Sequence, residues 1–141
     1  MDKPKMTHEV RKKVKTLIKN RIDISDIIEK YSIRGEDLSG AIISRFVRTD
    51  ENMSCCNLSR AIIGDDNLIS NFNRANARNC NFKGSVWKGR VLARRIDARG
   101  SNFNGAIMPH VDYRYADLRN CNFCDTVFCI GTERGYGAIF S

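Results

Sequence analysis

Residues 101–130 read SNFNG AIMPH VDYRY ADLRN CNFCD TVFCI and divide without remainder into six blocks of five residues. Each block opens with a small residue, and an aromatic or large apolar residue stands at its centre, as Phe103 and Leu118 do. Helices repeat their apolar residues every three or four positions and strands every second position. A sustained period of five therefore indicates a repeat architecture.

The same spacing extends upstream, although its phase slips twice. One residue is lost between Leu68 and Phe72, and one is gained between Leu92 and Ala98. The blocks ADLRN and CNFKG, each with a small residue, Asp or Asn, Leu or Phe and then two further residues, resemble the pentapeptide-repeat family. The resemblance covers residues 31–130 and implies an all-β solenoid, a right-handed four-sided parallel β-helix of about five coils.

Residues one coil apart should stack, and the block centres form four columns of similar side chains. Only Arg48 breaks the apolar pattern of these centres. The predicted core stack consists of Leu38, Leu58 and Leu118; Ile43, Ile63, Phe82, Phe103 and Phe123; Leu68, Trp87, Met108 and Phe128; and Phe72, Leu92 and Tyr113.

Residues 1–30 are predicted to form an amphipathic helical cap, because the end of a solenoid exposes core and backbone. Val10, Val14 and Leu17 share one face of a helix whose other faces are basic. A second short helix is expected over 26–31. A DNA-binding helix–turn–helix is the weaker interpretation of this pair. Residues 131–141 would be a C-terminal tail or cap.

We expect neither metal nor cofactor. Cys56, Cys80 and Cys121 stand at inward opening positions and fill the core. Cys121 and Cys124 have the spacing of a zinc or redox pair but should face opposite sides of a strand. Cys124 and Cys129 are the best candidates for reactive thiols.

No catalytic residues are predicted, and no small-molecule substrate. The chain has two histidines, His8 and His110, and lacks a phosphate-binding glycine motif or nucleophile elbow. Asp97 and Asp117 are assigned to turn hydrogen bonding. Neither a signal peptide nor an apolar run of membrane-spanning length is visible, so we expect a cytoplasmic protein without a membrane partner.

Three charged residues are hard to place in this scheme. Glu51, Asp66 and Arg90 all stand at opening positions that should point inward. Because an unpaired buried charge is costly, a local loop or a shifted coil is expected there.

The net charge is +8, with a sequence pI near 9.4, and residues 70–119 hold ten basic and three acidic groups. Their arginines could bind an anionic partner or form a solvated face balanced by aspartates. The candidate anion-binding residues are Arg74, Arg78, Arg94, Arg95, Arg99 and Arg119. Members of the pentapeptide-repeat family are known for mimicking DNA on gyrase. A basic chain departs from that electrostatic pattern, and gyrase or topoisomerase binding is kept as a minor alternative.

One outward column is apolar where the family pattern has Asp or Asn. The candidate dimer face consists of Val47, Val86, Ile107 and Val127, extended by Ile69 and Ile130. A large exposed apolar patch usually marks an interface. A two-fold homodimer, the N-terminal helix or the C-terminal tail could cover it. We therefore predict a non-enzymatic scaffold or protein-interaction module, with a nucleic-acid-associated protein as the alternative.

Overall fold

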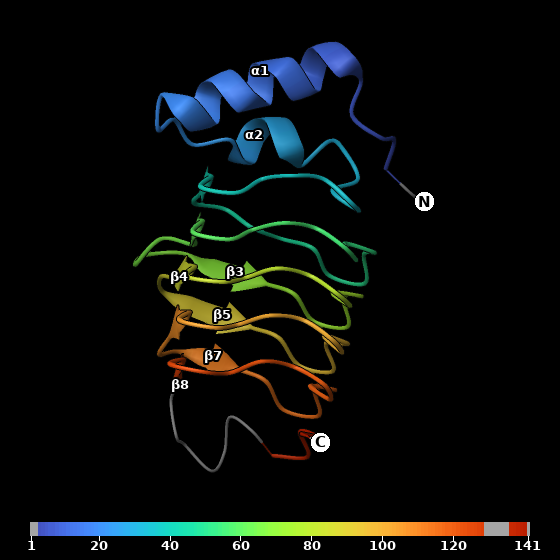
Figure 1. Cartoon of the computed structure of the whole chain (residues 1–141), viewed down its shortest axis with the longest axis vertical. Coiled ribbons are helices and arrows are strands. Elements are labelled where there is room, and N and C mark those ends of the chain that lie inside the picture. Colours follow the sequence, from blue (N-terminus) through green and yellow to red (C-terminus); the bar gives the residue numbers. More distant parts are fainter. Residues whose placement is uncertain (1–2, 129–135, 141) are drawn as a thin grey trace.

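The computed structural model describes residues 3–128 and 136–140. Successive circuits of the chain, here called coils, stack along one axis below two helices, and the two termini lie toward opposite ends (Figure 1). The elements within the described residues are α1 (His8–Lys19), α2 (Ser25–Ile28), β1 (Ile42–Ile43), β2 (Ile62–Ile63), β3 (Ile69–Asn71), β4 (Val86–Trp87), β5 (Arg90–Leu92), β6 (Ile107–Met108), β7 (Val111–Asp112) and β8 (Val127–Phe128).

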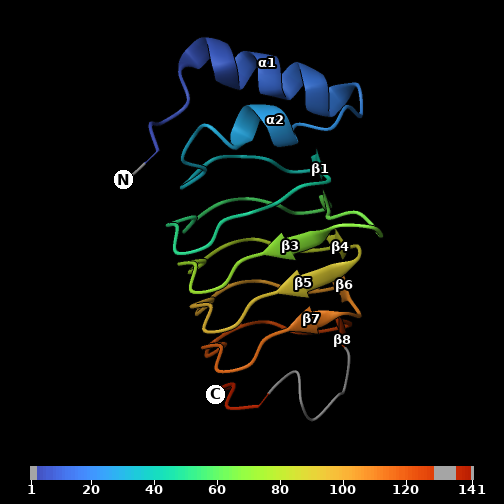
Figure 2. The same ribbon diagram turned by 180° about the vertical axis from the view of Figure 1, so that it is seen from behind.

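These strands form two parallel sheets. One has the order β1-β2-β4-β6-β8 and the other the order β3-β5-β7. Ile42 pairs with Ile62, and Ile107 with Val127, each twenty residues apart. Figure 2 shows β3, β5 and β7 one above another, each from the next coil. The period of five residues thus produces short strands that pair with the neighbouring coils.

The turns between blocks are built by side-chain to backbone hydrogen bonds. Asn57 Oδ1 accepts from the backbone N–H of Ser59 at 3.0 Å, and Asn102 Oδ1 accepts from that of Asn104 at 2.9 Å. Asp97 and Asp117 make the same bond to the residue two positions on, as the sequence predicted. A left-handed residue then closes the corner, and Arg60 adopts φ 56° there.

Most of the predicted core stack is buried. Phe82, Phe103 and Phe123 stack with centroid separations of 4.9 and 5.2 Å. The buried members are Leu38, Leu58, Leu118, Ile43, Ile63, Phe82, Phe103, Trp87, Met108 and Phe72, while Phe123 and Tyr113 are half-buried. Phe128 pairs with Met108, but its side chain lies outside the described part.

The first phase slip is an insertion. Ile62 pairs with Val86, 24 residues on, so this coil is four residues longer than the coil before it. Residues 64–68 leave the regular path, and Leu68 is 39% exposed. Leu68 is therefore wrong as a core residue, while Asp66 lies in a local loop as expected. The loop passes so close to β4 that a Cβ on Gly64 would lie 2.2 Å from the Lys88 carbonyl oxygen.

The insertion shifts the predicted columns by one block. Phe82 belongs to the column of Leu58, because the Leu58 N–H donates to the carbonyl of Asn81 at 2.7 Å. Trp87, and not Phe82, follows Ile63. The prediction therefore assigned the residues of the first two coils to the wrong columns of the later coils. The error is one block at every column.

The second phase slip, predicted between Leu92 and Ala98, lies earlier in the chain. Val91 and Ala93 are buried, whereas Leu92 is half-buried and pairs with Asn71 and Asp112. Leu92 is therefore wrong as a core centre. The extra residue lies between the centres Trp87 and Ala93. Arg90, for which a local loop or a shifted coil was expected, is exposed in β5, next to this extra residue.

Two helices lie over the first coil (Figure 1). The side chain of Thr7 caps α1 by accepting from the N–H of Val10 at 3.2 Å. Val14 is buried, and Val10, Leu17 and Ile18 pack against the core. The second helix is α2, shorter than the span predicted for it.

Arg48, the exception among the block centres, joins this helical segment to the first coil. Its side chain is 2% exposed and donates to the carbonyls of Ile28 at 2.6 Å and Tyr31 at 2.8 Å. Glu51 supplies the counter-charge at 2.9 Å. Because the first coil has α2 above it and not another coil, a cation can bind the free carbonyls at the end of that helix.

Residues 136–140 continue the pairing at the other end of the stack. Tyr115 N–H donates to the carbonyl of Tyr136, and Leu118 N–H to that of Ile139, both at 2.8 Å. Among the described residues there is no helix with the length and apolar character needed to cross a membrane.

Candidate interaction faces

The five-stranded sheet carries an outward column of aliphatic side chains, here called the aliphatic ladder. Ile107 is 43% exposed and Val127 50%, and the other three members are half-buried. Parallel pairing in register aligns all of them along the stack. The members of the aliphatic ladder are Ile42, Ile62, Val86, Ile107 and Val127.

The predicted dimer face overlaps this ladder only in part. Val86, Ile107 and Val127 belong to it. Val47 is wrong as a member, because it pairs with Asn71 on the neighbouring column, and Ile69 is wrong because it pairs with Arg90 in the other sheet. Ile130 lies outside the described residues. The insertion explains the error, because it places Ile42 and Ile62 where Val47 and Asn67 were expected.

The segments that could have covered this face lie elsewhere in the described part of the chain. The helix α1 lies on the end of the stack (Figures 1 and 2). Residues 136–140 pair with residues 115–118, which belong to a different column. Neither of these described segments covers the lower ladder, where Ile107 and Val127 are exposed.

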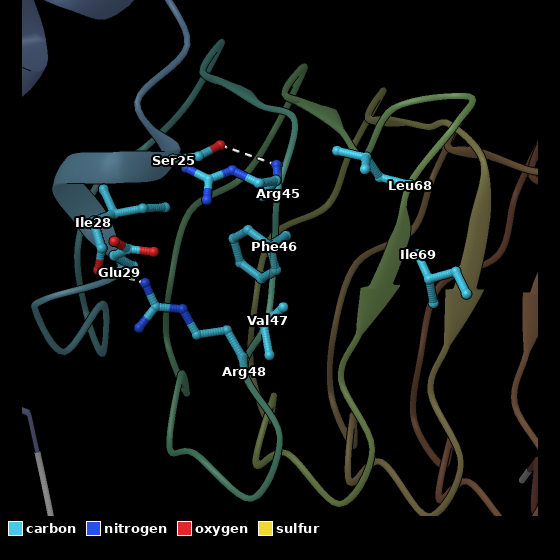
Figure 3. A pocket seen from close by; sticks show the side chains of 9 residues that line it. All are labelled: Ser25, Ile28, Glu29, Arg45, Phe46, Val47, Arg48, Leu68 and Ile69. Carbon is cyan, nitrogen blue, oxygen red and sulfur yellow. Dashed lines mark hydrogen bonds between the residues drawn. The ribbon is translucent and has the colours of Figure 1, made fainter.

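A pocket of about 250 Å³ opens beside the ladder, between α2 and the inserted loop (Figure 3). Two of its polar residues already have partners: Ser25 Oγ accepts from the Arg45 N–H at 3.0 Å, and the Arg45 side chain forms an ion pair with Asp26. Val47, Leu68 and Ile69 form an exposed apolar part of its rim. The lining residues are Ser25, Ile28, Glu29, Arg45, Phe46, Val47, Arg48, Leu68 and Ile69.

The arginines predicted to bind anions are held by aspartates. Arg99 donates from Nε and Nη2 to Asp97 at 2.9 and 2.8 Å. Arg119 binds Asp117 in the same way, at 2.9 and 2.7 Å. The hydrogen bonds from Arg99 lower the pKa of Asp97. We call this network, together with the pairs around Asp112, the acid–arginine mesh.

Asp112 is the most buried carboxylate of the mesh. Arg94 Nε donates to it at 2.7 Å, and Arg114 donates to both of its oxygens at 3.0 and 2.8 Å. Burial alone would raise its pKa, but the hydrogen bonds from Arg114 and Arg94 outweigh burial and lower the pKa of Asp112 to about 2. The carboxylate is therefore ionised at neutral pH.

The remaining predicted arginines also have partners. Arg78 Nε lies 3.7 Å from Asp97. Arg74 forms an ion pair with Asp50 at 2.7 Å. Arg95 lies over the ring of Tyr115, with its guanidinium carbon 4.8 Å from the ring centroid. Five of the six arginines thus belong to a surface of alternating charge, one of the two arrangements that the sequence allowed.

The inward cysteines are poor nucleophiles in this structure. Burial raises the pKa of the Cys56 thiol, raises that of Cys80 to about 12, and raises that of Cys121. Cys124 is exposed, and Cys129 lies outside the described residues. Over residues 3–128 and 136–140, no group of three or more His, Cys, Asp or Glu could hold a metal ion.

Comparison with known proteins gives one family. The family model for pentapeptide repeats matches residues 90–125 in eight copies. No curated protein matches the chain. The matched segment contains β5, β6 and β7, whose parallel pairing agrees with the β-helix that such repeats form. Residues 90–125 of the chain therefore consist of pentapeptide repeats.

Proposed function

We propose that this chain is a non-enzymatic scaffold that binds protein through the aliphatic ladder. The observation that carries the proposal is the unbroken outward column of five Ile and Val residues on a five-stranded sheet. Their removal from water would supply the driving force for association, at about 25 cal/mol per Å² of apolar surface.

The proposal includes the geometry of the scaffold and its location. It takes the repeats as a right-handed four-sided β-helix of about five coils, with residues 1–30 as its cap, working in the cytoplasm. Backbone pairing between coils holds each face in a fixed register, so a partner would meet a preorganised surface. The side chains at the ladder have no charge, which favours a protein surface over a polyanion there.

The partner in this proposal is a second copy of the chain. In a two-fold dimer the ladder would face its own copy, with Val86 near the middle of the column. The pocket between α2 and the inserted loop would then lie beside the interface, and the exposed apolar residues on its rim would extend the contact.

The test is the oligomeric state of a double variant, Val86→Lys with Ile107→Lys. We expect the parent chain to be a dimer and this variant a folded monomer in sedimentation equilibrium. A matched control is Ser59→Lys with Asn104→Lys, because both residues share a turn column with the native Lys83. The control should stay dimeric. A parent chain that is monomeric at high micromolar concentration would rule out self-association through this face.

Nucleic-acid binding through the arginine column receives less support. Arg99 and Arg119 already use two nitrogens each on a carboxylate, the geometry with which arginine would meet a phosphate. Gyrase or topoisomerase binding by charge mimicry is disfavoured by the net charge of +8.

A further inference from the structure

The outer face of α1 carries a row of lysines, here called the lysine stripe: Lys12, Lys15 and Lys19. Their spacing of three and four residues places them on one side of the helix. The opposite side, with Val14 at its centre, is packed on the core. Because α1 lies across the end of the stack, the lysine stripe forms part of the outer surface of that end (Figure 1).

These lysines differ from the arginines of the mesh in having no counter-charge. All three are exposed, and within the part of the chain that the structure describes their ammonium groups form no ion pair or side-chain hydrogen bond. On the same helix Arg11 is bound to Glu36 at 2.8 and 3.0 Å. Glu9 is the one acidic residue of α1.

The surroundings add to the positive potential of this end. Lys13 and Arg21 are exposed as well and have no acidic partner among the described residues. The lower coils, by contrast, compensate much of their arginine charge locally. Residues 1–30 carry nine basic and five acidic groups, so this end of the stack has a net charge of +4, away from the arginines that the column pattern selected.

We propose that the lysine stripe binds the phosphate backbone of double-stranded nucleic acid without reading its sequence. Lysine binds phosphate as a point charge. The three lysines span about 10 Å along α1, about three base pairs of a duplex. No base reading is required of them, because backbone contacts fix position and carry no sequence information.

The packing of α1 argues against an anionic membrane as the partner. A helix that binds a bilayer surface inserts its apolar face between the lipids. In this chain that face is already used, since Val14 is buried and Val10, Leu17 and Ile18 contact the core. Only the charged side of the helix remains available.

The experiment compares the salt dependence of duplex DNA binding for two triple variants of the full chain. One is Lys12→Gln with Lys15→Gln and Lys19→Gln. The other is Arg78→Gln with Arg99→Gln and Arg119→Gln, which removes the same net charge from the mesh. Each phosphate neutralised contributes about −0.9 to the slope of log K against log salt. The lysine variant should therefore lose up to about 2.7 from the slope, and the arginine variant much less.

A third variant carries arginine at the same three positions of α1, which keeps the charge, and should retain the slope of the parent. Circular dichroism of each variant checks that the fold is kept. Equal loss of slope in the lysine and arginine variants would overturn the proposal, because net charge and not location would then govern binding. Absence of duplex binding at about 50 mM salt would also overturn it. So would loss of binding to anionic vesicles with unchanged duplex binding.

Discussion

Two outward columns of this protein have the same relation to the coil but opposite chemistry. The aliphatic ladder and the column of Asn52, Asn76, Asp97 and Asp117 each lie one position before the inward centres, and both are aligned by parallel pairing. The second column accepts hydrogen bonds from the turn N–H groups two residues on. The ladder makes no such bond in the described residues, yet its strands pair equally well. The residue type at the outward position therefore does not determine whether the coil forms. This position can carry apolar residues that bind a partner or charged residues that form ion pairs.

If that is correct, the largest loss of stability should come from an inward centre. Phe103→Ala removes a ring that stacks between Phe82 and Phe123 and is 5% exposed. We expect a loss of about 3–5 kcal/mol in the free energy of unfolding, from lost burial and the cavity left behind. Denaturant unfolding measures it.

The outward control for this change is Val127→Ala, on the ladder. It should cost less than about 1 kcal/mol, because half of that side chain is already in water. Comparable losses in the two variants would contradict the division between inward and outward positions.

The sequence predicted the parallel β-structure because its strongest signal comes from the inward positions. Small opening residues and large centres recur with the same period wherever they must fill the interior, as at Ala116 and Leu118. The amphipathic helix α1 was predictable too, from the apolar stripe of Val10, Val14 and Leu17.

The aliphatic ladder was only partly predictable, because its identity depends on the register across the insertion. A count of blocks treats the residues that begin at Asp66 as one more block, with Leu68 as its apolar centre. A triplet signal would have been better: a small residue, then Ile or Val, then a large centre. It occurs at 41–43, 61–63, 85–87, 106–108 and 126–128, and also at 138–140, where Ile139 pairs with Asp117 outside the ladder.

The acid–arginine mesh was only partly predictable from columns, which allowed an arginine face balanced by aspartates as one of two interpretations. Arg99 and Asp97 are two residues apart, and their contact follows from side-chain rotamers above a turn. The role of Arg48 also needed the structure, because a single arginine among apolar centres gives no indication of which carbonyls it will bind.

A loss of stability smaller than that of Phe103→Ala is expected where an outward carboxylate is buried by its arginine partners. Asp112→Asn removes the charge that Arg94 and Arg114 share, and should cost about 1–3 kcal/mol at pH 7. The pKa of Asp112 is about 2 in the folded chain, and an ordinary aspartate titrates near 3.9 when unfolded. Its contribution is therefore complete above about pH 4 and is lost as the pH falls through about 2.

Urea unfolding at several pH values tests this assignment. The parent should lose stability between about pH 4 and pH 2, and the Asp112→Asn variant should lose less over the same window. Hydrogen bonds from arginines also lower the pKa of Asp97 and Asp117, so some acid sensitivity remains in both chains. Parallel pH profiles of the parent and the variant would show that Asp112 is not the dominant group.

The smallest effect on stability should come from exchanging the chemistry of the two outward columns. Ile107→Asn places on the ladder the residue type that the neighbouring columns already carry at this position, as at Asn102 and Asn122. Ile107 is 43% exposed, so little burial is lost, and the lower strand propensity of Asn costs at most about 1 kcal/mol. Unfolding should therefore change little while self-association weakens, as dilution experiments by light scattering would measure. A large loss of stability without any change in association would mean that the ladder serves the coil itself and not a partner.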